Sequence, residues 1–158
     1  LPVATIRPFN TFGPRQSARA VIPTIISQAL AGDTIRLGAL TPVRDFTSVE
    51  DTVAAFMKVA EAPDTVGQVV NIGTGQGVTI GEVANMVLSM CSGQKHVRAD
   101  QERFRPTKSE VLELVCNNTK AKALLGWEPQ YTLSQGLQKT CAYIKDHLHL
   151  YKTHMFTL

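Results

Sequence analysis

Residues Val3–Arg15 read VATIRPFNTFGPR and join an apolar run to a polar loop. The first residues of this stretch are small or favour β-structure, which predicts a short buried strand that Pro8 ends. Asn10 follows almost at once, and Gly13–Pro14 marks a turn. In α/β proteins, ligands bind beyond the carboxyl ends of parallel strands. The stretch therefore predicts a strand at 3–7 that leads into a ligand-binding loop.

The rest of the chain alternates predicted strands with predicted helices, which favours an α/β fold. Short runs rich in apolar residues predict strands at 34–37 and 68–72, and extended pieces are expected at 44–47, 96–99 and 112–116. Apolar residues at intervals of three and four predict helices at 20–30, 49–61, 80–90 and 119–125, and a long helix from 132 or 134 to about 148.

The predicted helix at 49–61 has a clear start signal. Ser48 is expected to cap it, with Asp51 three residues later in place of the glutamate of a capping box. The spacing predicts that the apolar side chains of this helix face the core, namely Val53, Phe56, Met57 and Ala60.

Length and composition limit the class of protein. With 158 residues, 44% of them hydrophobic, the chain can bury a core, and we expect residues 1–158 to form a single domain. The net charge is only +3, without a run of Lys or Arg, which argues against a nucleic-acid-binding domain. Three widely spaced cysteines predict free thiols in a reducing compartment, and hence a cytoplasmic protein. The sequence suggests neither a membrane span nor a metal site.

Residues Gly73–Gly77 read GTGQG and follow the predicted strand at 68–72. A Gly-rich turn between a strand and a helix can cradle a phosphate with its backbone N–H groups. The pattern is shorter than the dinucleotide-binding fingerprint, and a tight turn explains the glycines equally well. Both explanations stay open at this point.

Three polar residues stand at the ends of strand-like runs: Asn10, Arg44 and Asn71. A parallel sheet would bring these ends to one edge. An arginine at such an edge suits an anion with two acceptor oxygens, such as a diphosphate. Solvated surface groups are the alternative explanation.

Several longer motifs follow one another in order. They read RPFNTFGPRQ, VIPTII, IRLGALTPVRDFTSVEDTVAAF, VVNIGTGQGVTIGEV and RPTKSEVLELVCNNTKAKALLGWEP. With this order and spacing, the chain up to about residue 148 resembles the C-terminal half of an extended short-chain dehydrogenase/reductase. The resemblance is strongest to the NAD-dependent nucleotide-sugar epimerases and 4,6-dehydratases. It implies an α/β substrate-binding part that keeps remnant strands of a Rossmann sheet. Residues 1–17 would form the last part of the edge of that sheet, and residues 150–158 would form a tail.

The resemblance also implies roles for individual residues. Pro8 and Phe9 would lie near the nicotinamide of the cofactor. A nucleotide sugar would be bound by Asn10, Val21, Ile35, Leu37, Arg44, Asn71, Arg105 and Glu110. Within this set, the diphosphate would contact Asn10, Arg44 and Asn71. The base would lie between Ile35 and Leu37.

The family's catalytic residues are not found in this sequence. Its Gly-rich dinucleotide loop and its Tyr-x-x-x-Lys helix would precede Leu1, and the residue four positions after Tyr131 is Gln135 instead of lysine. We therefore expect no catalytic residue in the chain. NAD(P) is the cofactor that the resemblance implies for the parent enzymes, and we expect the chain alone to bind none.

Two interpretations of function follow from these features. The first is the part of an NAD(P)-dependent sugar epimerase or 4,6-dehydratase that binds a nucleoside-diphosphate sugar, inactive by itself. The second is a truncated, stand-alone module that is not catalytic and binds a ligand or assembles with itself. In either case, strand edges that lack neighbours could pair with another copy to give a homodimer.

Overall fold

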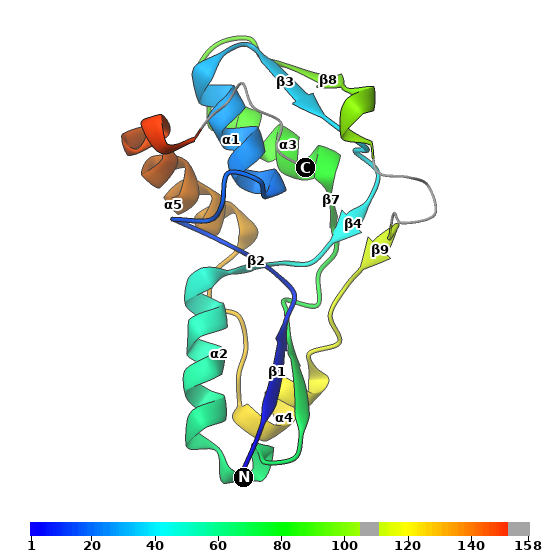
Figure 1. The fold of residues 1–158 in the computed structure, drawn as a ribbon, viewed down its shortest axis with the longest axis vertical. Helices are drawn as coiled ribbons and strands as arrows, with labels where there is room; N and C mark the ends of the chain where they lie inside the picture. Colours follow the sequence, from blue (N-terminus) through cyan, green and yellow to red (C-terminus); the bar gives the residue numbers. More distant parts are fainter. Residues whose placement is uncertain (105–110, 152–158) are drawn as a thin grey trace. The chain divides into compact units, whose positions relative to one another are not determined.

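The computed structural model describes residues 1–104 and 111–151, in two compact units (Figure 1). Unit 1 consists of Leu1–Gly13, Val43–Val78 and Glu113–Gly136. Unit 2 consists of Pro14–Pro42, Thr79–Leu112 and Leu137–Leu158. The single domain expected over residues 1–158 stays a prediction.

The strands of both units pair in parallel, which confirms the α/β class. In unit 1, β1 (Thr5–Pro8) pairs with β6 (Val69–Ile72), and β2 (Asn10–Phe12) pairs with β5 (Phe46–Ser48). A further small sheet has the order β7-β4-β9, made by Val78–Thr79, Val43–Arg44 and Glu113–Leu114. In unit 2, β3 (Thr34–Leu37) pairs with β8 (His96–Ala99).

The predicted helices are confirmed to within about two residues at most ends. They are α1 (Val21–Ala31), α2 (Val49–Glu61), α3 (Ile80–Ser89), α4 (Thr119–Leu125) and α5 (Leu133–Asp146). Short 3₁₀ turns cover Pro63–Thr65, Gln101–Arg103 and Leu148–Leu150. Two strands were missed, because β2 and β7 lie where no strand was predicted, and the piece predicted at 44–47 is divided into β4 and β5.

Local capping explains where three helices start or end. The Ser48 hydroxyl accepts the N–H of Asp51 at the start of α2, and Thr79 and Glu82 form a full capping box at the start of α3. The Thr79 bonds also lower the pKa of Glu82. Gly126 ends α4 with φ of 54°, a left-handed conformation that glycine adopts without strain.

The core of unit 1 is built around Trp127, which is only 2% exposed. Its cluster contains Val70 and Ile72 from β6, Ala55 from α2 and Ala121 from α4, with Ile6 and Leu125 packed against it. The indole N–H donates to the backbone carbonyl of Asp51 at 3.1 Å. The buried Trp therefore joins α2, α4 and the β1–β6 sheet through one side chain.

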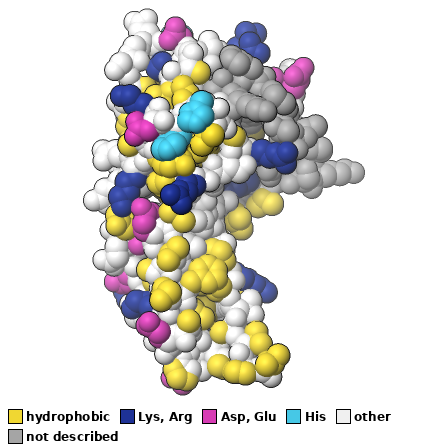
Figure 2. All heavy atoms as spheres, turned by 60° about the vertical axis from the view of Figure 1, so that its left-hand side comes forward, with side chains coloured by type: hydrophobic (Ala, Val, Ile, Leu, Met, Phe, Trp, Pro, Cys, Tyr) yellow, Lys and Arg dark blue, Asp and Glu magenta, His cyan; other side chains and the backbone are white. Residues whose placement is uncertain are grey.

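Helix α2 faces the opposite way from its predicted orientation. Val53, Phe56 and Met57 are 55%, 47% and 57% exposed, whereas the buried positions are Asp51, Thr52 and Ala55. Figure 2 shows hydrophobic side chains gathered on a face of the molecule that carries α2.

Polar contacts account for this orientation. The Asp51 carboxylate accepts the backbone N–H groups of Gln130 and Tyr131 at 2.9 and 3.1 Å, and the Thr52 hydroxyl lies 3.0 Å from that of Thr11. These bonds hold the polar side of α2 inward, because a buried carboxylate is stable only with its acceptors satisfied.

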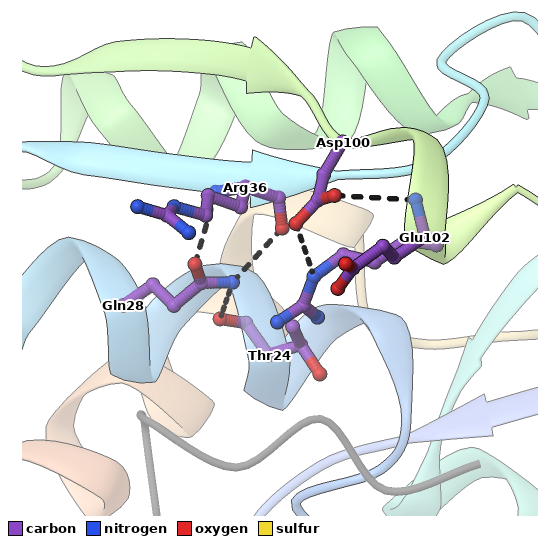
Figure 3. Close-up of polar contacts among 6 residues, drawn as sticks. Thr24, Gln28, Arg36, Asp100 and Glu102 are labelled. Carbon is purple, nitrogen blue, oxygen red and sulfur yellow. Dashed lines mark hydrogen bonds and ion pairs between the residues drawn. The ribbon is translucent and has the colours of Figure 1, made fainter.

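The core of unit 2 is formed by apolar side chains of two helices and one strand. Helices α1 and α3 bury Ile22, Ile25, Ile26, Val83 and Val87, and β3 buries Ile35 and Leu37. The side-chain amide of Gln28 on α1 bonds both backbone groups of Arg36 on β3, accepting its N–H at 2.9 Å and donating to its carbonyl at 3.2 Å (Figure 3). The Gln28 side chain therefore hydrogen-bonds one edge of β3 as a neighbouring strand would, and β8 pairs with the other edge.

Replacing Thr47 with valine should raise the free energy of unfolding by about 1 kcal/mol. Thr47 is fully buried, and its hydroxyl has no hydrogen-bond partner among the described residues. Valine keeps the shape and removes the unsatisfied group. The matched control is Thr52→Val, because the Thr52 hydroxyl donates to the Ser48 carbonyl at 3.0 Å and its loss should destabilise the protein. Urea unfolding of both variants tests the contrast, and a loss of stability in Thr47→Val would contradict it.

Candidate functional site

The first group of predicted site residues follows β1 in unit 1. Register pairs Arg7 with Asn71 and Pro8 with Ile72 across the β1–β6 sheet, and the Phe9 N–H donates to the Ile72 carbonyl at 2.8 Å. Pro8, Phe9 and Asn71 therefore lie at the same carboxyl edge of one parallel sheet. Of the three residues predicted to share an edge, Asn71 belongs to this sheet, whereas Asn10 lies in the β2–β5 sheet and Arg44 in the β7-β4-β9 sheet. Ligands of α/β proteins bind at edges of this type.

Asn10 and Arg44 are brought together through the backbone of Asp45. The Asn10 side-chain amide donates to the Asp45 carbonyl at 3.1 Å, and Arg44 is the preceding residue. The Arg44 side chain is half-buried, and its Nη1 donates to the Val43 carbonyl at 2.8 Å. An amide and a guanidinium are both hydrogen-bond donors suited to an anion with several oxygens.

Asp45 is a residue that the sequence analysis did not single out. It is fully buried, and its carboxylate accepts four hydrogen bonds. The donors are the N–H and hydroxyl of Thr74 at 2.9 and 2.6 Å, the Gly75 N–H at 2.8 Å and the Cys116 N–H at 3.2 Å. One signal was present in the sequence, namely an acidic residue directly after Arg44 and inside an extended piece.

The GTGQG loop behaves as a tight turn held from within. Asp45 takes the N–H groups of Thr74 and Gly75, and the Thr74 hydroxyl takes that of Gln76 at 3.1 Å. Asn118 donates to the Gly73 carbonyl at 2.9 Å. A phosphate cradle needs free N–H groups that point at the ligand. These three amides already have acceptors, so this loop does not fit the pyrophosphate of a dinucleotide.

The second group of predicted site residues lies in unit 2. Val21 is the first residue of α1 and is half-buried. Ile35 and Leu37 on β3 are 0% and 3% exposed, so their side chains belong to the core of the unit. Their role next to a base stays a prediction. Arg105 and Glu110 lie outside the described residues.

The Cys116 thiol reports on the Asp45 network. Burial, and after it the negative charge of Asp45, raise the pKa of Cys116 to about 11. Between pH 9 and 11 the unfolded chain loses this proton while the folded protein keeps it, so stability should fall as the pH rises through this window. We expect a smaller fall between pH 8 and 10.5 in Cys116→Ala, measured by urea unfolding. An equal fall in both proteins would contradict the assignment.

In residues 1–104 and 111–151, no group of three or more His, Cys, Asp or Glu side chains could hold a metal ion. Over the same residues, every helix is too short or too polar to cross a membrane.

Comparison with known proteins assigns the fold to a family. Residues 1–140 match the family model described as GDP-mannose 4,6-dehydratase. UDP-glucose 4-epimerase from Mycolicibacterium smegmatis is 32% identical over 151 residues, which are 92% of this chain and 46% of that protein. The chain thus spans about half the length of the curated relatives it matches.

Solved structures agree with this assignment. UDP-glucose 4-epimerase from Thermotoga maritima, solved with UDP-glucose, has a TM-score of 0.81 and 31% identity over 90% of this chain and 46% of that one. A dTDP-glucose 4,6-dehydratase from Bacillus anthracis, solved with NAD, has a TM-score of 0.82 and 28% identity over 93% of this chain and 46% of that one. The chain therefore belongs to the GDP-mannose 4,6-dehydratase family of extended short-chain dehydrogenase/reductases, and corresponds to the C-terminal half of such proteins.

Proposed function

We propose that the chain binds the diphosphate of a nucleotide sugar, as part of an NAD(P)-dependent epimerase or 4,6-dehydratase. The observation that carries this proposal is the hydrogen bond from the Asn10 side chain to the backbone carbonyl of Asp45, the residue next to Arg44. Asn10 follows the carboxyl end of β1 in the β1–β6 sheet. A guanidinium can bind two diphosphate oxygens at once, and an amide N–H can bind a third. The relatives solved with UDP-glucose support a ligand of this class.

In this proposal, the described residues bind the substrate and carry none of the proton-transfer or hydride-transfer chemistry. NAD(P), when bound in such enzymes, takes and returns a hydride. In this chain, Pro8 and Phe9 would contribute to the surface near the nicotinamide, as the family resemblance implies. The amides of Thr74, Gly75 and Gln76 in the GTGQG loop are occupied internally, and we propose that the chain alone binds no NAD(P) and is inactive by itself. A cytoplasmic location belongs to the same proposal.

Calorimetric titration tests the binding. UDP-glucose, dTDP-glucose and GDP-mannose are titrated into the full chain, with uridine as a probe that lacks the diphosphate. We expect binding of at least one nucleotide sugar and none of uridine. Arg44→Ala should weaken binding at least tenfold, because it removes a charge-assisted contact.

Lys120→Ala is the matched control for the loss of a positive charge. Lys120 is exposed in the same unit and bonds the Gln68 side chain at 2.8 Å, away from the Asp45 network. This variant should keep the wild-type affinity. The proposal fails if none of the three nucleotide sugars binds, or if both variants lose affinity equally.

The exposed apolar face of α2 favours a second candidate function, a self-assembling module. Val53, Phe56 and Met57 are all close to half exposed or more, and within the described residues β1 pairs only with β6. An open strand edge and an apolar helix face are both surfaces that another copy of the chain could cover. Light scattering decides this point: a dimer that Phe56→Glu converts to a monomer supports it, and a wild-type monomer contradicts it.

A further inference from the structure

We infer that Asp45 is a positioning residue for the diphosphate-binding side chains, an inference that rests on the function proposed above. This residue connects three other segments of the chain, around residues 10, 74–75 and 114–116. Its carboxylate holds the Thr74–Gly75 loop and the Cys116 backbone, and its main chain holds Asn10 and β9. The positions of Asn10 and Arg44 therefore depend on Asp45, which is itself buried.

The carboxylate is stabilised entirely by dipoles of neutral groups. Its four donors are three backbone N–H groups and one hydroxyl, at 2.6 to 3.2 Å. Hydrogen bonds to a charged acceptor are shorter and stronger than bonds between neutral groups. In a site closed to water they also fix direction, because each donor must point at one of two oxygens. Asp45 thus sets where the loop after β6 and the segment after β9 lie.

The main chain of Asp45 connects this network to Asn10 and Arg44, the proposed diphosphate-binding residues. Its carbonyl accepts the Asn10 amide at 3.1 Å, and its N–H donates to the Leu114 carbonyl at 3.0 Å. Arg44 pairs with Leu114 in the β4–β9 register and is covalently joined to Asp45. A shift of residue 45 would therefore move the Asn10 contact and the Arg44 backbone together.

The Asp45 charge also decides which N–H groups remain for an anion. With the amides of Thr74 and Gly75 bound to the carboxylate, the loop offers them to no phosphate. Asparagine at position 45 would keep the size of the side chain but turn an NH₂ group toward N–H donors. At least one of the present bonds must then break, and the loop must move.

The decisive variant is Asp45→Asn, studied in the full chain with UDP-glucose, dTDP-glucose and GDP-mannose as probes. We expect it to fold and to bind at least tenfold more weakly than wild type. The matched control is Asp51→Asn, a buried carboxylate in the same unit that also accepts backbone N–H groups but contacts neither Asn10 nor Arg44. It should lose stability and keep its affinity, a difference that a merely structural role of Asp45 would not produce.

A second measurement is independent of any ligand. Amide hydrogen exchange at Thr74 and Gly75 should become faster in Asp45→Asn than in Asp51→Asn, because only the first variant disturbs their acceptor. If Asp45→Asn does not fold, Thr74→Ala removes one of the four bonds more gently and should weaken binding a few-fold. Unchanged exchange at both amides, or wild-type affinity in folded Asp45→Asn, would overturn the inference. If wild type binds no nucleotide sugar, the proposed function fails, and the exchange rates still test the placement of the loop by Asp45.

Discussion

Replacing Gly73 with alanine should lower the free energy of unfolding by about 3 kcal/mol, the upper part of the range for overpacked cores. A Cβ at this position would overlap the Cβ of Cys116 and lie 2.8 Å from an Asp45 carboxylate oxygen and 2.9 Å from the Cys116 Sγ. The neighbours are buried and hydrogen-bonded, so they cannot move apart cheaply. Residue 73 is glycine because the segments that carry Asp45 and Cys116 pack against it and leave no room for a side chain.

The measurement is urea unfolding of the variant beside Gly32→Ala. Gly32 ends α1 in an extended conformation, and a Cβ there would meet nothing within 4 Å. The control should therefore change stability by less than about 0.5 kcal/mol. Gly73→Ala should also weaken nucleotide-sugar binding, because the displaced group is Asp45. Equal stability of the two variants would show that the Gly73 contact is not tight.

The fold was largely predictable because its elements carry local signals. Apolar runs ended by Pro8, or followed by Gly73, marked strands, and Ser48 marked a helix start whose cap is confirmed. Strand β2 was missed because its three residues carry no apolar run and pair only with β5, which is 36 residues away. Strand β2 forms because it pairs with β5, and no local sequence pattern predicts it.

The orientation of α2 and the role of Asp45 could not be obtained in the same way. Helical periodicity identified an apolar stripe on α2, but burial follows the hydrogen bonds of Asp51 to residues 79 and 80 positions later. Asp45 likewise meets Thr74 and Cys116 across 29 and 71 residues. Long-range polar contacts of buried carboxylates override the local pattern, because an unsatisfied buried charge costs more than a few exposed apolar side chains.

The arrangement of the site shows the same division. Asn10, Arg44 and Asn71 were recognisable from their position after strand-like runs and from the family resemblance. The network that connects Asn10 to Arg44 was not, since it consists of backbone atoms and one acidic side chain. The candidate ligand-binding residues carry a chemical signal in the sequence, whereas the contacts of Asp45 are visible only once the chain is folded.

The second large effect is expected at Trp127, whose replacement by alanine should cost about 3–5 kcal/mol. This residue is the largest of the fully buried side chains and contacts elements from three separate stretches of unit 1. Alanine would leave a cavity among Ala55, Val70 and Ile72, and would leave the Asp51 carbonyl without its indole donor. For a protein of this size the melting temperature should fall by about 10 °C.

Two further variants separate the contributions to this loss. Trp127→Phe keeps much of the ring volume and removes the N–H, so its cost should be about 1–2 kcal/mol, close to that of the hydrogen bond and the smaller ring. Phe104→Ala removes an aromatic ring that is 48% exposed and should cost less than about 1 kcal/mol. In thermal unfolding of the three variants, we therefore expect the loss of stability to decrease in the order Trp127→Ala, Trp127→Phe, Phe104→Ala. If Trp127→Phe were as damaging as Trp127→Ala, the bond to Asp51 would outweigh the packing, and Asp51 would be the centre of the unit 1 core.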